Sequence, residues 1–106
     1  MTENMEAMLE SGQDNALLRF TLGSAFLKKG DAAQAVKHLR VAVQYDTEYS
    51  AAWKIYGKAL QELGDFEAAQ AAFESGIAAA QSHGDVQAAK EMKVFLKRVL
   101  KALGTP

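Results

Sequence analysis

The sequence predicts an all-α protein, built as an array of helix-turn-helix repeats. The only proline among its 106 residues is the last one, and alanine and leucine are abundant, a composition that favours helices. Gly-Asp pairs occur three times, at residues 30–31, 64–65 and 84–85. Because glycine often closes a helix and aspartate often caps the next one, these pairs mark turns. Several residues also recur at a spacing of 34 positions.

The turns divide the chain into five expected helices, which span residues 15–29, 32–45, 48–63, 66–83 and 86–103. Thr47 is the expected N-cap of the third helix, since threonine accepts hydrogen bonds from free backbone amides. The fourth helix should be longer than usual, because nothing breaks it before Ser82. A sixth, shorter helix over residues 3–11 would place Met5, Met8 and Leu9 on one face.

The spacing of 34 residues relates two successive pairs of helices. In one register it pairs Gly23 with Gly57, Ala25 with Ala59, Gly30 with Gly64, Asp31 with Asp65 and Ala35 with Ala69. The second unit contains Trp53-x-x-Tyr56-Gly57-x-x-Leu60, followed by Ala69-x-x-x-Phe73. This pattern resembles the tetratricopeptide repeat, W-x-x-L-G-x-x-Y followed by A-x-x-x-F with a 34-residue period. In the first unit, Arg19 replaces the tryptophan.

The resemblance implies one domain over residues 15–106, with repeats at 16–49 and 50–83 and a capping helix at 85–103. Residues 1–14 precede it as an acidic tail or a short helix. A cap is expected because two repeats leave an apolar end face. The last helix has an apolar face suited to that role, formed by Met92, Phe95, Leu96, Val99, Leu100 and Leu103.

Gly23 and Gly57, which share one register of the repeat, both lie inside predicted helices. Glycine costs about 1 kcal/mol there relative to alanine. We therefore expect the paired helix to approach closely at both positions, with Ala35 and Ala69 as the small partners. Tyr45 is expected in the core, at a site that is usually apolar in the repeat.

The family resemblance implies a protein-binding module that uses a concave surface lined by the first helix of each repeat. On this chain that surface holds eight candidate residues, Leu17, Phe20, Ser24, Leu27, Lys28, Lys54, Lys58 and Gln61. Lys54 and Lys58 are four apart and therefore share a helix face. Beside Phe20 and Leu27, they suit a peptide or helix with an acidic residue or a C-terminal carboxylate. The alternative is that both lysines are solvated surface.

Some members of the family bind chaperone C-termini through a clamp of lysine, asparagine and arginine residues. Ser24 and Lys58 stand where the clamp has asparagine, so we do not expect that activity. The runner-up function is self-assembly through the end faces, as a homodimer or a subunit of a larger complex. Residues 1–12 could be disordered, cover the lysine-lined groove or join a neighbouring subunit. The sequence does not identify the partner.

Charge is balanced overall but uneven along the chain. The net charge is −1, while residues 1–15 carry −4 and residues 84–106 carry +3. The basic last helix is expected to be a solvated face, with docking to an acidic partner as the alternative. Nucleic-acid binding is not expected, since a basic excess is missing. Phe95 is expected to face the core, which leaves no aromatic surface for base stacking.

The composition argues against an enzyme. The chain has no cysteine and only two histidines, and it contains neither a catalytic triad pattern nor a glycine-rich phosphate loop. We expect no catalytic residues, no metal site and no cofactor. No apolar run approaches the ~18 residues of a membrane span, and the acidic N-terminus does not resemble a secretory signal. A cytoplasmic location is therefore expected.

Overall fold

A computed structural model describes residues 2–105, so Met1 and Pro106, at the outer ends of the predicted ranges, lie outside it. The described chain forms six helices, α1 (Thr2–Glu10), α2 (Ala16–Lys28), α3 (Ala32–Tyr45), α4 (Ser50–Glu62), α5 (Phe66–Ser82) and α6 (Val86–Ala102). Over these residues there is no strand, which confirms the predicted all-α class. The helix ends differ from the expected ones by no more than two residues.

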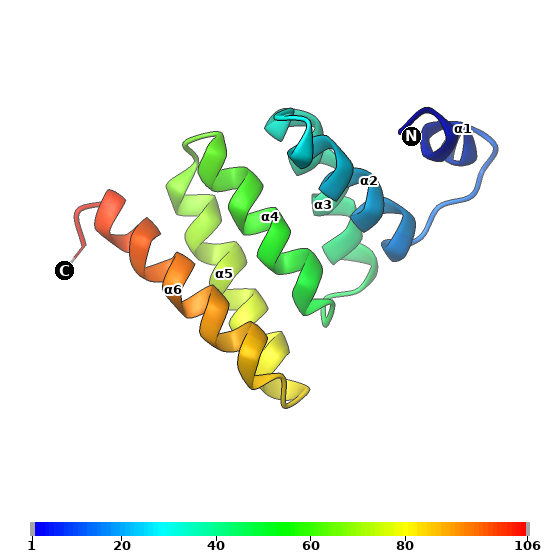
Figure 1. Cartoon of the computed structure of the whole chain (residues 1–106). Helices are drawn as coiled ribbons and strands as arrows, with labels where there is room; N and C mark the ends of the chain where they lie inside the picture. The colour runs from blue at the N-terminus through cyan, green and yellow to red at the C-terminus, as the bar shows by residue number, and fades with distance from the viewer. Residues whose placement is uncertain (1, 106) are drawn as a thin grey trace.

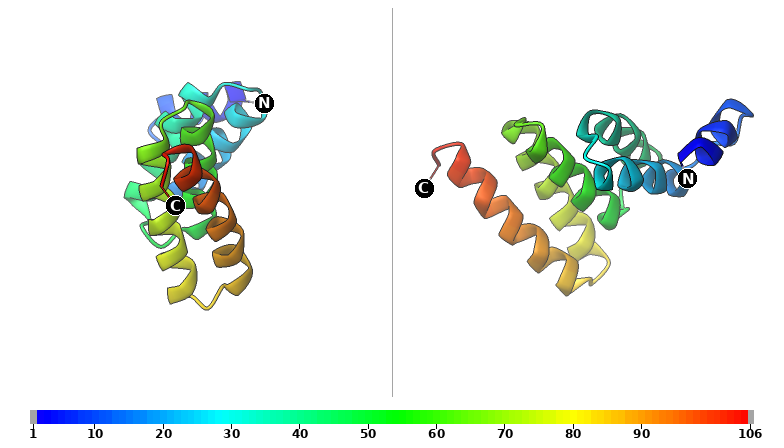
Figure 2. Two further views of the ribbon diagram at one scale, coloured as in Figure 1. Left: turned by 90° about the vertical axis from the view of Figure 1, so that its left-hand side faces the viewer. Right: turned by 45° about the horizontal axis from the view of Figure 1, so that its top comes forward.

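The helices form an elongated two-layer array (Figure 1). Helices α2, α4 and α6 make one layer and α3 and α5 the other, and each helix packs against its neighbours in sequence. The molecule measures 47 × 29 × 18 Å. Its two ends are occupied by α1 and α6, as the right-hand view in Figure 2 shows. No described helix is both long and apolar enough to cross a membrane.

The Gly-Asp pairs form the turns as predicted. The side chains of Asp31, Asp65 and Asp85 accept hydrogen bonds from the backbone N–H three residues later. The expectation for Thr47 was wrong, because α4 has Tyr49 at its N-cap and no side-chain cap. The carbonyl oxygen of Thr47 instead accepts a hydrogen bond from Trp53 Nε1 at 2.8 Å. This bond ties the turn before α4 to the helix itself.

Close helix approach occurs at Gly23 and Gly57 as expected, but its partners differ from those expected. A Cβ at Gly23 would lie 2.5 Å from Leu39 Cγ, and one at Gly57 would lie 2.5 Å from Phe73 Cε1. Leu39 and Phe73 are fully buried. The glycines therefore make room for large side chains of the facing helix, and the nearest atoms do not belong to alanines.

A polar network takes the place of the missing tryptophan in the first repeat. Arg19 Nε and Nη2 donate to the two carboxylate oxygens of Asp14 at 2.8 and 2.9 Å, and Arg19 Nη1 lies 3.1 Å from His38 Nδ1. The Arg19 guanidinium lowers the pKa of Asp14. The His38 ring stacks on Phe26 with centroids 5.5 Å apart. Arg19 thus fixes the linker before α2 to both helices of the repeat.

Tyr45 belongs to the same network, and its expected place in the core was wrong. It is 55% exposed, because it is the last residue of α3 and extends past the helix contact. Its hydroxyl donates to Asp14 Oδ2 at 2.9 Å, which raises the pKa of Tyr45. The tyrosine therefore serves as a polar anchor at the surface.

Helix α1 packs against α2 and against no other described helix. Lys29 Nζ donates to the buried Thr2 Oγ1 at 3.1 Å, and Met5 and Met8 lie near Leu18 and the rest of the start of α2. The two helices are therefore antiparallel. The N-terminal segment is a helix at the end of the array and does not cover Lys54 or Lys58.

Replacing Gly57 by alanine should destabilise the fold. The added Cβ would collide with the ring of Phe73, which is stacked on Phe95 and cannot easily move. Overpacking costs about 1–3 kcal/mol, which exceeds the ~1 kcal/mol that alanine gains in helix propensity. Denaturant unfolding followed by circular dichroism should show a lower free energy of unfolding for Gly57→Ala.

Ala71→Gly is the matched control, since Ala71 is exposed on α5. Ala71→Gly measures helix propensity at a site without crowding. At this position the wild type, with alanine, should be more stable than the glycine variant. A gain in stability on Gly57→Ala would contradict the packing argument.

The stability should decrease in mildly acidic solution because of His38. Burial lowers the pKa of His38, and the nearby Arg19 lowers it further. Below the ordinary value of 6.5 the unfolded chain therefore binds more protons than the native one, so stability rises with pH there. The stability that the neutral His38 contributes is fully present above pH 6.5 and is lost as the pH falls toward the pKa of His38 in the native state.

The variant His38→Asn tests this assignment, because an amide oxygen can accept the Arg19 hydrogen bond without titrating. Free energies of unfolding are compared above and below pH 6.5. The wild type should lose more stability than the variant across this range. Equal losses would show that other groups cause the pH dependence.

Candidate functional site

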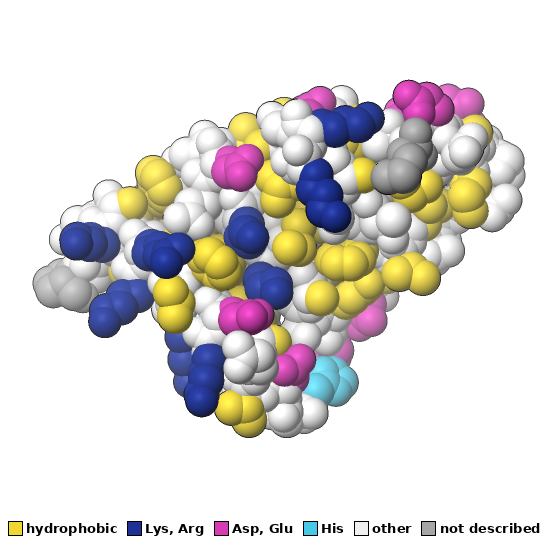
Figure 3. Space-filling model, in the orientation of Figure 1, with side chains coloured by type: hydrophobic (Ala, Val, Ile, Leu, Met, Phe, Trp, Pro, Cys, Tyr) yellow, Lys and Arg dark blue, Asp and Glu magenta, His cyan; other side chains and the backbone are white. Residues whose placement is uncertain are grey.

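Basic and apolar side chains alternate on the face formed by α2, α4 and α6. Figure 3 shows lysine and arginine side chains in the middle of this face, with hydrophobic side chains between them. Five of the eight predicted site residues line two hollows on it. We call this surface the α2–α4–α6 face.

The first hollow lies between α2 and α4 and has a volume of about 260 Å³. It is lined by Ser24, Leu27, Lys28, Ile55, Lys58 and Glu62, so it brings together four of the predicted residues. The Oγ of Ser24 is enclosed and has no hydrogen-bond partner among the described residues. The hollow thus combines apolar walls, two amines and an unused hydroxyl.

The second hollow lies between α4 and α6 and encloses about 210 Å³, lined by Ser50, Ala51, Lys54, Asp85, Gln87, Ala88 and Glu91. Lys54 Nζ is 3.1 Å from Glu91 Oε1, and Gln87 Nε2 donates to Glu91 Oε2 at 3.5 Å. The hydrogen bond from Lys54 lowers the pKa of Glu91, and the weaker effect of the hydrogen bond from Gln87 lowers it further. Lys54 is therefore engaged in joining α4 to α6 and is not a free cation.

Phe95 connects this face to the core. It is half-buried and stacks on Phe73 with centroids 5.6 Å apart and an interplanar angle of 15°. Lys58 Nζ and Arg98 Cζ lie 5.3 and 5.5 Å from the centroid of its ring, within cation–π range. The expectation that Phe95 belongs to the core is therefore only partly right.

Sequence reasoning missed Ile55, Glu91 and Arg98 as contributors to this face. The spacing of Phe95 and Arg98 contained a usable signal, because residues three apart on a helix are neighbours. The Lys54–Glu91 pair had no such signal. It depends on how α6 is rotated against α4, and α6 does not follow the 34-residue register.

The remaining predicted residues lie at the margins. Leu17 is 65% exposed and lines a hollow with Met5 and Met8 of α1, at the end of the array. Phe20 packs against the Tyr49 ring with centroids 5.0 Å apart. Gln61 is half-buried, one turn after Lys58, and is not among the residues lining either hollow.

The chemistry of this face is that of binding by charge and apolar contact. Four cations, Lys28, Lys54, Lys58 and Arg98, outnumber the three carboxylates, Glu62, Asp85 and Glu91. Within residues 2–105, no cluster of three or more potential metal-ligating side chains occurs. Both histidines lie elsewhere, His38 beside Arg19 and His83 with its Nε2 3.6 Å from Glu48 Oε1.

Comparison with known proteins gives a consistent result. Residues 26–92 match the tetratricopeptide repeat family. The TPR repeat-containing protein PA0015 of Pseudomonas aeruginosa is 52% identical over 102 residues, which cover 96% of this chain and 97% of that protein.

Solved structures agree. Protein BPP2914 from Bordetella parapertussis is 51% identical, with a TM-score of 0.80 over 96% of this chain and 89% of that chain. The Sgt2 TPR domain from Aspergillus fumigatus has a TM-score of 0.81 over 97% of this chain and 68% of that chain. Its 24% identity makes it evidence for the fold alone. The family match covers more than half of this chain and PA0015 aligns with nearly all of it. The chain therefore belongs to the tetratricopeptide repeat family.

Proposed function

We propose that this chain is a non-catalytic interaction module that binds an acidic segment of another protein on its α2–α4–α6 face. Members of the family typically mediate protein–protein interactions and are not enzymes. The observation that carries the proposal is the hollow in which Leu27 and Ile55 lie beside Lys28 and Lys58. This combination fits a partner segment with an apolar side chain next to a carboxylate.

The size of the hollow supports a peptide over a small molecule. Its volume of about 260 Å³ is below the ~300–1,000 Å³ of typical pockets for small molecules. One apolar side chain of a partner can occupy it while the partner backbone continues along the face.

The cations contribute mainly to orientation and to the rate of association. Lys28 is exposed at the rim, and rim charges change on-rates more than affinities. Lys58 and Arg98 both lie over the ring of Phe95. Their two positive charges are therefore already positioned before a partner binds. Lys54 would need to leave Glu91 before it could bind a partner carboxylate.

Charge reversal at the hollow tests the proposal. The variant Lys28→Glu/Lys58→Glu should bind acidic peptides at least ~10-fold more weakly, equivalent to ~1.4 kcal/mol, because attraction becomes repulsion. Peptides selected from a random array by the wild type serve as probes, and fluorescence anisotropy measures their affinity. Lys54 is left unchanged, since a glutamate there would face Glu91 and separate α4 from α6.

The matched control is Lys90→Glu/Lys97→Glu, which changes the net charge equally at exposed sites of α6 outside the hollow. Its affinity for the selected peptides should remain close to that of the wild type. Unchanged binding by the Lys28/Lys58 variant, or an equal loss in the control, would contradict the proposed site. Circular dichroism establishes that all three proteins are folded.

A further inference from the structure

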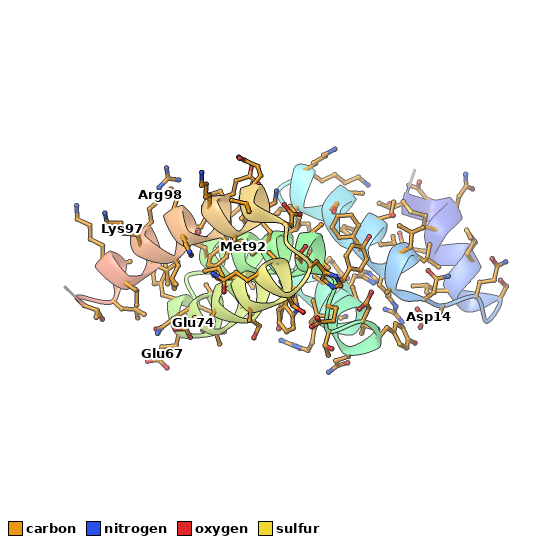
Figure 4. The ribbon with its side chains drawn as sticks, turned by 90° about the horizontal axis from the view of Figure 1, so that it is seen from below. Asp14, Glu67, Glu74, Met92, Lys97 and Arg98 are labelled. Atoms are coloured by element: carbon orange, nitrogen blue, oxygen red, sulfur yellow. The ribbon has the colours of Figure 1, made fainter. Side chains whose placement is uncertain are left out.

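The outer side of α6 is a basic ridge with an apolar centre. Lys90, Val94, Lys97 and Lys101 are spaced as successive positions on one helix face, opposite the buried Ala89, Met92 and Val99. All four are exposed, and Val94 is 51% exposed. Figure 3 shows basic side chains gathered along this end, and Figure 4 shows Lys97 and Arg98 projecting from α6 away from Glu67 and Glu74 of α5.

An apolar hollow lies beside this ridge. It has a volume of about 240 Å³ between α5 and α6, with Val86, Ala89, Lys90 and Lys93 among its lining residues. Val86 is 64% exposed. Helix α4 packs between α3 and α5, whereas α6 packs against α5 and more lightly against α4. The outer side of α6 is therefore uncovered by any helix of the described chain.

The opposite end of the array is acidic, with apolar side chains of its own. Glu6 and Glu10 are four apart on α1 and exposed, and residues 1–15 contain no basic residue. Met8 and Leu17 are 38% and 65% exposed and line a hollow of about 270 Å³ between α1 and α2. Figure 3 shows acidic side chains over α1, at the far end from the basic ones on α6.

The two ends also complement each other in architecture. Helix α1 precedes α2 and runs antiparallel to it, as α3 precedes α4. In the order of helices it therefore stands where the second helix of a repeat would, although it packs on α2 more lightly than α3 packs on α4. Its own first helix does not exist in the described chain. Helix α6 occupies the place of a first helix that has no second helix.

We propose that copies of this chain associate head to tail, with α1 of one copy against the outer side of α6 of the next. The contact would complete a helix pair between two copies and bring the acidic end onto the basic one. It uses none of the residues that line the two hollows of the α2–α4–α6 face, so it is independent of peptide binding there.

Charge favours this arrangement over a symmetric dimer. A two-fold interface places the same surface of both copies together. An α6–α6 contact would oppose lysines to lysines, and an α1–α1 contact would oppose carboxylates to carboxylates, which disfavours both. Only the head-to-tail contact joins opposite charges. Such a contact repeats without closing, so the average mass should continue to rise beyond that of a dimer.

The association should be weak and sensitive to salt. An end of 29 × 18 Å offers less than the ~800 Å² per partner of a standard stable interface. Salt screens exposed charges over about 8 Å at physiological ionic strength. The assembly should therefore form at high protein concentration and dissociate when salt is added.

Two charge-reversed chains provide the test. Lys90→Glu/Lys97→Glu changes the charge of residues 84–106 from +3 to −1, and Glu6→Lys/Glu10→Lys changes that of residues 1–15 from −4 to 0. Analytical ultracentrifugation measures the average mass over a range of protein concentrations at low salt. The wild type should associate, and each variant alone should have an association constant at least ~10-fold lower.

Mixing the two variants gives the decisive measurement. The first variant retains a native α1 and the second retains a native α6, so the mixture contains one unaltered interface and should associate again. This result does not depend on whether an altered helix stays folded, since neither altered surface takes part. Glu67→Lys/Glu74→Lys on α5 is a control with the same number of reversed charges, and it should associate like the wild type.

Several outcomes would overturn the proposal. A wild type that remains monomeric at every concentration would do so, as would a mass that stops at that of a dimer. Association of each variant alone as strongly as the wild type would also refute it, and so would a mixture that stays monomeric. Peptide binding by the α2–α4–α6 face is measured separately and can succeed or fail independently of these results.

Discussion

The close packing of the two helices within each repeat is the constraint on which the rest of the structure depends. Gly57 leaves the space that the ring of Phe73 occupies. Phe73 is fully buried there and stacks on Phe95, which fixes α6 against the array because close-packed interiors transmit such constraints. Phe95 in turn lies beneath Lys58 and Arg98. The positions of these surface cations therefore follow from a glycine in the core.

Local chemistry made most of the fold predictable. The Gly-Asp turns need only backbone geometry and a capping carboxylate, so they could be located without tertiary information. Thr47 and Tyr45 were misplaced because their roles depend on side-chain contacts that helix-end propensity does not include. Trp53 Nε1 donates a hydrogen bond to the Thr47 carbonyl oxygen, and the Tyr45 hydroxyl donates one to Asp14 Oδ2. Both errors lie at helix ends, where propensity and tertiary contact compete.

The candidate site was predictable in outline but not in detail. The 34-residue register placed Ser24, Leu27, Lys28 and Lys58 on one face, and the structure groups these four around one hollow. The state of Lys54 depends instead on α6, which lies outside the register. The rotation of α6 about its own axis determines that Glu91 lies within ion-pair distance of Lys54. A periodic pattern predicts which residues share a face, whereas their pairing across helices requires the packed structure.

Arg19 shows why the two ends of the array differ. In the second repeat, Trp53 lies between repeats and packs against buried residues on both sides. Within the described residues no repeat precedes the first one, so an indole at residue 19 would leave apolar surface exposed there. A guanidinium instead forms two hydrogen bonds to Asp14 and holds the linker from α1. At the other end, lysines on α6 face solvent where a further helix would pack. At each end, charged side chains thus stand beside the apolar residues that remain exposed. The two terminal segments carry net charges of opposite sign, −4 for residues 1–15 and +3 for residues 84–106. These charges favour contact between unlike ends, whereas equal signs would keep all copies apart.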